Sequence, residues 1–185
     1  MEHTALVIID MQDGFNDPIW GKRNNPKLEN NVASLLKHWR ENRWPVFHIQ
    51  HLSRNLKSPL HEGHSGVKIM DCAKPMGDEP IIQKNVNSCF IGTNLETILR
   101  KAGIINLVFS GIASDHCVST STRMAANLGF NCYVASDATT SFDRKDQNGT
   151  TYPGDLVHSI SLASLHGEFA TVVNTRNLIE KGNMQ

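Results

Sequence analysis

Short apolar segments alternate along this chain with longer segments in which apolar residues recur every three or four positions. Runs rich in valine and isoleucine occur at Ala5–Ile9, Pro45–Ile49, Pro80–Ile82, Ile104–Ile112, Asn131–Ala135 and Phe169–Val173. Helical spacing occupies Lys27–Glu41, Thr93–Ala102, Val118–Leu128 and Gly154–Leu165. Continuous apolar strands that alternate with helices are typical of a parallel sheet with helices on both faces. The pattern therefore predicts a three-layer α/β fold.

Residues that begin and end helices support this interpretation. In "GTNLETILRKAG", Thr93 is predicted as the N-cap, because Glu96 follows three residues later in the manner of a capping box. Gly103 follows the basic end of the same segment, and Gly129 follows the helix that contains "MAANLGF". A glycine just beyond the last helical residue is a common helix terminator.

One long stretch, Ser53–Glu79, has two prolines, three glycines and no steady period. Irregular segments of this length are uncommon in compact domains and tend to be functional. A functional role, such as that of a lid or an oligomer contact, is therefore expected for this segment, and the sequence does not choose between them.

Length and charge limit the classes of partner. The 185 residues fit one domain, predicted to span residues 1–185. The 18 basic and 18 acidic side chains balance, so charge gives no reason to expect nucleic acid or an anionic membrane surface. No apolar run approaches the roughly 18 residues of a membrane-spanning helix. A small-molecule substrate and other copies of the same chain, in a homo-oligomer, are the expected partners.

Cysteine usage indicates a reducing compartment. The chain has no Cys-x-x-Cys pair, and "MEHTALVIIDMQ" lacks the basic-then-apolar layout of a secretion signal. A cytoplasmic protein with free thiols is expected. No Gly-x-Gly-x-x-Gly motif follows the first strand, which argues against a dinucleotide, and no cofactor is expected.

Three residues with complementary chemistry stand at the carboxyl ends of predicted strands. Asp10 ends "ALVIID", Lys84 ends "PIIQK", and Cys117 follows the fourth strand at the start of a helix. Ligands of doubly wound sheets bind beyond these strand ends. A helix N-terminus and a cation such as Lys84 lower the pKa of a thiol, and a carboxylate such as Asp10 can transfer its proton.

Each of these residues also has an ordinary structural interpretation. Free cysteines are mostly small buried hydrophobes, a strand-terminal aspartate often caps a turn, and a lone lysine is usually solvated. Taken singly, those interpretations would be preferred, but three such residues at three ends of one sheet favour a site. The small residues Gly111, Ala113 and Ser114 leave backbone N–H groups of the fourth-strand turn open to a developing oxyanion.

Three segments resemble the isochorismatase-like cysteine hydrolase family, which includes nicotinamidases and N-carbamoylsarcosine amidohydrolases. They are "LVIIDMQDGF", "IIQKNVNSCFIGTNLETILR" and "VFSGIASDHCVSTSTRMAANLGFNCYVASDATTSFD", in the family's order and spacing. The resemblance implies a Rossmann-like sheet of six parallel strands and a catalytic triad of Asp10, Lys84 and Cys117. The thiolate would attack a carbonyl carbon, Asp10 would carry the proton, Lys84 would stabilise both charges, and water would hydrolyse an acyl-thioester.

The resemblance also implies an oxyanion hole. A cis peptide bond between Ile112 and Ala113, neither of them proline, would turn the N–H of Ala113 toward the oxyanion that the N–H of Cys117 also faces.

Two departures from better-known members of the family narrow the expected activity. Isochorismatases proper lack the nucleophilic cysteine, so Cys117 favours hydrolysis of an amide or ureido C–N bond over vinyl-ether cleavage. Metal-dependent nicotinamidases carry an Asp-x-His cluster after the second strand, which "HIQHLSRNLKSPLHEGHSG" lacks. The histidines of this segment are therefore interpreted as pocket or surface residues, and no metal site is expected. They are His48, His51, His61 and His64.

Residues just beyond the strand ends are the candidates for substrate binding. Phe15, His51, Asn87 and Phe90 would suit a small, flat amide or ureido compound, and the choice among nicotinamide-like, carbamoyl and other acyl substrates stays open. His116, next to the nucleophile, is expected to serve packing, hydrogen bonding or a subunit contact, because adjacent helical residues do not share a face.

Several functional hypotheses stay open at this point. The leading one is a cysteine-dependent hydrolase of a small-molecule C–N bond. Isochorismatase-type hydrolysis of another metabolite and a non-catalytic binding or scaffold protein of the same fold are alternatives. A thiol redox protein that pairs Cys117 with Cys89 or Cys132 is disfavoured, because neither forms a Cys-x-x-Cys motif with it.

Overall fold

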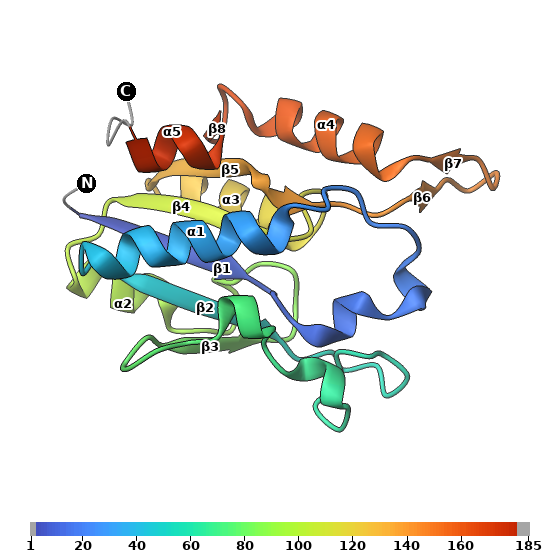
Figure 1. The fold of residues 1–185 in the computed structure, drawn as a ribbon, viewed down its shortest axis with the longest axis horizontal. Helices are drawn as coiled ribbons and strands as arrows, with labels where there is room; N and C mark the ends of the chain where they lie inside the picture. Colours follow the sequence, from blue (N-terminus) through green and yellow to red (C-terminus); the bar gives the residue numbers. More distant parts are fainter. Residues whose placement is uncertain (1–2, 181–185) are drawn as a thin grey trace.

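A six-stranded parallel sheet, with helices on both faces, forms the centre of the computed structural model, which describes residues 3–180 (Figure 1). The strands stand in the order β3-β2-β1-β4-β5-β8. Their bounds are β1 Thr4–Ile9, β2 Val46–His51, β3 Ile81–Lys84, β4 Asn106–Ile112, β5 Asn131–Thr140 and β8 Thr171–Val173. The helices are α1 Leu28–Glu41, α2 Leu95–Lys101, α3 Cys117–Asn127, α4 Gly154–Leu165 and α5 Thr175–Glu180. The predicted α/β fold and its parallel sheet are confirmed.

Strand β1 is apolar at every position after Thr4 because the sheet has a core on each face. Alternate residues Ala5, Val7 and Ile9 join one core with α2, α3 and α4. Leu6 and Ile8 join the other core with α1 and α5. Figure 1 shows α1 and α5 in front of the sheet and α2 and α3 behind it. Burial on both sides explains why the strands read as continuous apolar runs.

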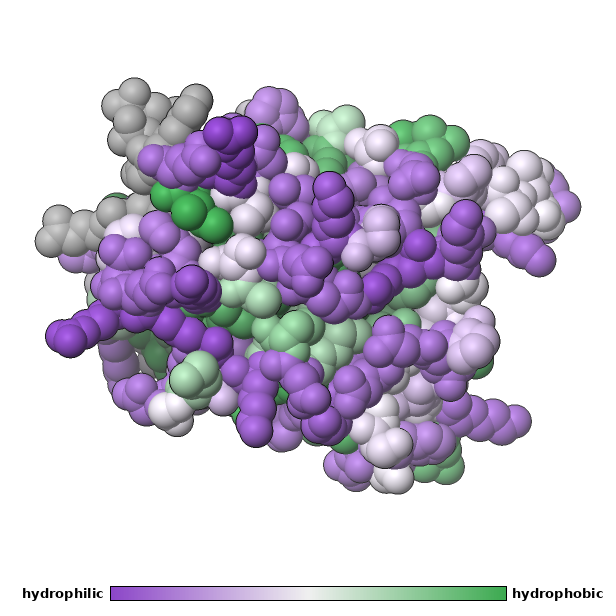
Figure 2. Space-filling model, viewed as in Figure 1, coloured by the Kyte–Doolittle hydropathy of each residue, from purple (hydrophilic) through white to green (hydrophobic). Residues whose placement is uncertain are grey.

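The outer surface over α1 has the opposite character. On the face shown in Figure 2, hydrophilic side chains predominate, and hydrophobic ones are confined to smaller patches. Within the described residues, no helix combines the length and the apolar character needed to cross a bilayer.

The predicted capping box of α2 is wrong. The helix begins at Leu95 with Asn94 as its N-cap, and Glu96 pairs with Arg100 instead of the N-cap backbone (2.8 Å). The hydroxyl of Thr93 donates to the carbonyl of Cys89 at 2.6 Å, so it anchors the preceding loop. The predicted helix terminators are confirmed, since Gly103 and Gly129 both adopt positive φ, at 67° and 86°.

Besides short 3-10 helices, the sequence pattern did not predict one hairpin and one α-helix. The hairpin is the short antiparallel pair of β6 (Arg144–Lys145) and β7 (Thr151–Tyr152), and the helix is the C-terminal α5. Each is too short to give a clear hydrophobic period, so the pattern carried no signal for them.

The long segment Ser53–Glu79 contains two short 3-10 helices, η3 (Ser65–Val67) and η4 (Asp71–Ala73). The buried side chain of Gln12 donates to the carbonyls of Val67 and His51, at 3.1 and 3.0 Å. At its end, Glu79 accepts hydrogen bonds from both Nε and Nη2 of Arg40 on α1. The segment is therefore fastened near its middle to the chain that follows β1 and at its end to α1.

Gly111 permits the close approach of β4 to β1. Its φ is 113°, and a Cβ at this position would overlap the carbonyl oxygen of Ile9. Gly129 also has positive φ, but a Cβ there would meet nothing within 4 Å.

We predict that Gly111→Ala destabilises the protein by more than about 3 kcal/mol, because the clash is with backbone that cannot move aside. The matched control Gly129→Ala should cost only about 1 kcal/mol, the strain of a left-handed backbone alone. Urea unfolding at neutral pH measures both. Equal losses in the two variants would contradict the close-approach argument.

Candidate active site

The ends of three elements bring Asp10, Lys84 and Cys117 together. Lys84 Nζ lies 2.7 Å from Asp10 Oδ2 and 3.4 Å from Cys117 Sγ. Asp10 follows β1, Lys84 ends β3, and Cys117 is the first residue of α3. The structure therefore confirms the sequence-based prediction that these three residues lie at one edge of the sheet.

Regular strand pairing produces this arrangement. Strand β2 lies between β1 and β3, and its last residue, His51, pairs in register with Lys84. Asp10 has a positive φ of 49°, and its N–H donates to the carbonyl of Ile49 on β2 at 3.0 Å. The chain thus turns sharply at the end of β1 while its carboxylate stays next to the end of β3.

The Lys84–Asp10 ion pair is removed from solvent, with both side chains 0% exposed. Burial by itself lowers the pKa of Lys84, but the negative charge of Asp10 and the sulfur of Cys117 outweigh it, so the pKa is raised. Lys84 is therefore a permanent cation in this site. Asp10 Oδ1 is buried and has no hydrogen-bond partner within residues 3–180, which leaves a carboxylate oxygen available to accept a proton.

The electrostatics of Cys117 differ from the sequence-based expectation of a lowered pKa. Cys117 is only 8% exposed, and burial raises the pKa of its thiol. The charge of Asp10 raises the pKa further, while Lys84 opposes the shift. The expectation considered the helix N-terminus and the cation but not the desolvation of a thiolate. At rest the site therefore holds a neutral thiol beside a carboxylate and an ammonium group.

His51 completes the surroundings of Lys84. Its Nδ1 lies 3.0 Å from Lys84 Nζ, and because an ammonium group only donates, Nδ1 acts as the acceptor. Burial, and then the positive charge of Lys84, lower the pKa of His51, which keeps its ring neutral.

The same residues bear on metal binding. Asp10, His51 and Cys117 each offer a ligand atom, and these atoms all lie within 4.8 Å of one another. The ammonium of Lys84 contacts all three residues. A cation is thus already held in the middle of this group, and the arrangement is centred on a lysine.

The remaining histidines of the second-strand region are dispersed. His48 is buried and pairs with Glu79 at 2.8 Å. His61 and His64 contact each other edge to face, with ring centroids 6.2 Å apart. His61 and His64 lie in the loop between β2 and β3, which agrees with the pocket-or-surface interpretation. For His48 that interpretation is wrong, because the residue is buried on β2 and does not line the pocket.

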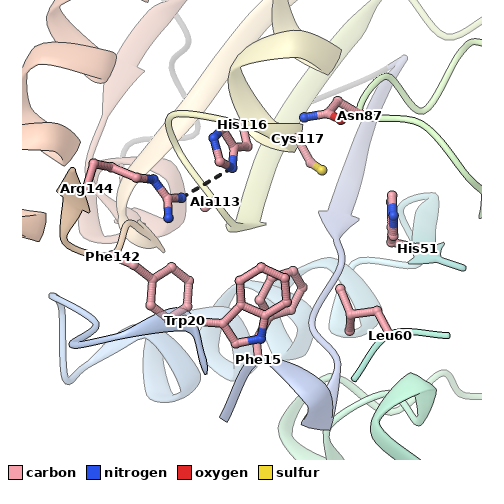
Figure 3. A pocket seen from close by; sticks show the side chains of 10 residues that line it. All are labelled: Phe15, Trp20, His51, Leu60, Asn87, Ala113, His116, Cys117, Phe142 and Arg144. Atoms are coloured by element: carbon pink, nitrogen blue, oxygen red, sulfur yellow. Dashed lines mark hydrogen bonds between the residues drawn. The ribbon is translucent and has the colours of Figure 1, made fainter. Parts of the chain in front are cut away.

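A pocket of about 150 Å³ opens over Cys117 (Figure 3). Of the predicted substrate-binding residues, Phe15, His51 and Asn87 line it. Phe90 does not: it stacks on Phe130 at 6.1 Å and packs against the core behind the sheet. An aromatic residue after a strand end can turn toward the core as readily as toward a ligand, and here burial against Phe130 prevails.

Four lining residues had no signal in the sequence pattern: Trp20, Leu60, Phe142 and Arg144. The rings of Phe15 and Trp20 are 5.2 Å apart, and Phe142 lies within about 6 Å of both. Figure 3 shows these rings across the cavity from Cys117. The wall that faces the thiol is therefore aromatic and apolar.

The turn after β4 carries the predicted oxyanion donors. The peptide bond between Ile112 and Ala113 is cis, as the resemblance implied. Within residues 3–180, neither the N–H of Ala113 nor that of Cys117 donates to a backbone carbonyl. Both residues line the pocket, so these groups are available to a ligand oxygen.

His116 also lines the pocket, but it is not a partner of the thiol. Its Nδ1 accepts a hydrogen bond from Arg144 Nη2 at 3.2 Å, drawn as a dashed line in Figure 3. The expected hydrogen-bonding role is therefore confirmed, and the residue also forms part of the pocket wall.

Comparisons with known proteins agree with the fold. The Isochorismatase domain model matches residues 4–176, and the chain therefore belongs to the isochorismatase family. It is 49% identical over 178 residues to the uncharacterized isochorismatase family protein YrdC of Bacillus subtilis, covering 96% of this chain and 95% of that one. It is 28% identical to Nicotinamidase 3 of Arabidopsis thaliana, over 94% and 86% of the two chains.

A solved structure is also closely similar. The crystal structure of an isochorismatase-family protein from Chromobacterium violaceum superposes with a TM-score of 0.92 at 39% identity, covering 95% of this chain and 91% of that one.

We predict that Cys117 is alkylated slowly by iodoacetamide at pH 7, and that its rate rises only above the pH range of an ordinary thiol, whose pKa is about 8.5. Asp10→Asn should move the rise to lower pH, because it removes a negative charge that raises the Cys117 pKa. Peptide mass spectrometry measures the rates, with Cys72 as the internal reference. If the alkylation rate of Cys117 began to rise at a lower pH than that of Cys72, the conclusion that the Cys117 thiol is neutral at rest would be contradicted.

We predict that Lys84→Met lowers the free energy of unfolding by about 3–5 kcal/mol, because it leaves a buried carboxylate without its partner. The double variant Asp10→Asn/Lys84→Met should recover part of that loss. Denaturant unfolding of the two single variants and the double variant measures the coupling, and strictly additive losses would show that the pair is not coupled.

Proposed function

We propose that this protein is a cysteine-dependent hydrolase that cleaves an amide or ureido C–N bond of a small molecule through an acyl-thioester. One observation carries the proposal: a single buried ammonium, Lys84 Nζ, contacts both the carboxylate of Asp10 and the sulfur of Cys117, and Cys117 lines a pocket. A binding protein has no need of a buried acid, base and nucleophile in mutual contact.

The neutral thiol requires a base at the moment of attack. As Cys117 Sγ bonds to the substrate carbonyl carbon, Asp10 accepts the thiol proton, for which Oδ1 is free. When the tetrahedral intermediate collapses, Asp10 returns this proton to the leaving nitrogen, and the C–N bond breaks. Water then attacks the thioester, Asp10 takes a proton from it, and the thiol leaves with that proton.

Lys84 supplies a fixed positive charge in every step. It stabilises the carboxylate of Asp10 at rest and the sulfur while negative charge develops on it. The open N–H groups of Ala113 and Cys117 are the proposed oxyanion hole, because hydrogen-bond donors preset in a water-poor site stabilise a developing oxyanion strongly.

The relatives support this choice of chemistry. Nicotinamidase 3 of Arabidopsis thaliana is similar over nearly the whole chain and bears an amidase's name. The Cys117 thiol lines the pocket. Its presence favours amide or ureido hydrolysis, because isochorismatase-type chemistry does not use a cysteine nucleophile.

The setting of the enzyme is a further part of the proposal. All four cysteines are free, which suits the reducing cytoplasm. Leu156 and Ile160 on α4 are 45% and 60% exposed, and such outward apolar residues support the expected homo-oligomer. The thiol redox alternative lacks support, because Cys89 and Cys132 are buried and neither lines the pocket with Cys117.

We predict that Cys117→Ala reduces ammonia release from active amides by at least about 1,000-fold, since no other group can form the acyl-enzyme. A panel of small amides and ureides, read by coupled ammonia detection, identifies a usable substrate first. Intact-protein mass spectrometry of wild-type enzyme quenched during turnover should show an acyl adduct on Cys117.

Cys72→Ala is the matched control, because Cys72 lies outside the pocket-lining residues. It should retain full activity. Unimpaired turnover by Cys117→Ala would end the thioester mechanism.

A further inference from the structure

Arg144 stands out among the pocket residues because it carries a full charge. The other lining residues are aromatic, aliphatic or neutral polar side chains, and none of the ten is acidic. The charge that faces the cavity is thus positive. Arg144 comes from the hairpin strand β6, whereas Asp10 and Lys84 come from the sheet.

The guanidinium of Arg144 is held in place from behind. Its Nε donates to Asp115 Oδ2 at 2.6 Å, and Ser141 Oγ donates to Asp115 Oδ1 at 2.7 Å. Burial on its own raises the pKa of Asp115, but the hydrogen bonds from Arg144 and Ser141 outweigh it and the pKa is lowered. Asp115 is therefore ionised, and its side chain is only 12% exposed.

A chain of buried hydroxyl groups fixes this support. Ser141 Oγ lies 2.7 Å from Ser114 Oγ, which in turn lies 2.9 Å from Nδ1 of His158 on α4. The carboxylate of Asp115 is thus oriented by neighbours that are themselves packed. A guanidinium anchored in this way loses little conformational freedom when it binds a ligand.

Part of the guanidinium remains available. Nη2 donates to His116 at 3.2 Å, while Nη1 makes no hydrogen bond within the described residues. The side chain is 27% exposed. Figure 3 shows it at the edge of the cavity, on the same side as His116 and Cys117 and across from the three aromatic rings.

We infer that the substrate of this enzyme carries a carboxylate, which Arg144 binds while the scissile carbonyl lies at Cys117. This inference rests on the proposed function and names its substrate class: a small amide or ureide with a carboxylate at its other end. A planar guanidinium matches a carboxylate in shape and charge. Cys117 and Arg144 line the same pocket of about 150 Å³, so one small molecule can contact both groups.

The aromatic wall fits the middle of such a molecule. Phe15, Trp20 and Phe142 offer apolar surface to a short carbon chain or a flat ureide, and they provide no partner for a second charge. Arg144 itself lies over the Phe142 ring, 5.8 Å from its centroid. The anion would therefore be bound at one end of the pocket only.

The first test compares hydrolysis of matched anionic and neutral amides. Succinamate and glutaramate are set against succinamide and glutaramide, with allowance for the second amide of each diamide. Wild-type enzyme should prefer the carboxylates in kcat/KM by about 10- to 100-fold, the usual effect of a hydrogen-bonded charge pair. Arg144→Gln should abolish the preference, mainly through KM, and Arg144→Lys should keep part of it.

Arg123→Gln is the matched control. Arg123 also lies over an aromatic ring, that of Phe169 at 4.3 Å, but it does not line the pocket. This variant should keep the wild-type preference. Hydrolysis of anionic and neutral amides at equal rates, unchanged in Arg144→Gln, would overturn the carboxylate inference and leave the proposed hydrolase intact.

A second test needs no turnover and so separates the two proposals. Alkylation of Cys117 is compared between N-iodoacetylglycine, which carries a carboxylate, and its neutral amide N-iodoacetylglycinamide, with Cys72 as the reference thiol. Faster labelling of Cys117 by the anionic reagent, lost in Arg144→Gln, supports carboxylate binding even if no amide of the panel is hydrolysed. If the ratio of the labelling rates at Cys117 and Cys72 were the same for the anionic and the neutral reagent, carboxylate binding by Arg144 would be refuted.

Discussion

The buried ion pair between Lys84 and Asp10 is the interaction on which the site depends. Two charges removed from water are stable only with well-placed partners, and these two come from β3 and the end of β1, on either side of β2. A shift of either neighbouring strand by one residue would move a charge away from its partner and turn its side chain to the other face. The pairing of His51 with Lys84 and the sharp turn at Asp10 are therefore constraints on fold and site together.

The same pair explains how a buried thiol can react. At rest the charges of Lys84 and Asp10 compensate each other, and Cys117 is neutral because burial raises its pKa. In the proposed reaction the proton moves from sulfur to Asp10 while negative charge appears on the substrate oxygen. The net charge of the site stays constant, and only its location changes. In a water-poor pocket this avoids the solvent reorganisation that a newly formed isolated charge would require.

The sequence predicted the strands of the sheet and the longer helices, but it predicted less of the loops and of the pocket wall. Apolar runs located the six strands, and because parallel strands end at one edge, Asp10, Lys84 and Cys117 could be assigned to that edge. Only the family resemblance implied that the three side chains meet. Phe90 and Thr93 were assigned wrongly, since both assignments depended on where one side chain points, which core packing and a loop carbonyl decided. Trp20, Phe142 and Arg144 lie in short irregular or hairpin segments without a period, and tertiary contacts alone bring them to the pocket.

The proposed catalytic groups and the residues that would recognise the substrate therefore lie on different kinds of segment. The proposed catalytic groups stand on the ends of strands and on a helix, whose geometry the packed core enforces. Most of the pocket wall comes instead from segments outside the sheet: Phe15 and Trp20 after β1, Leu60 from the long loop, and Phe142 and Arg144 around the hairpin. Such segments tolerate change without loss of the core. The nature of the substrate should therefore depend on residues such as Arg144, whereas the bond that is broken depends on the sheet.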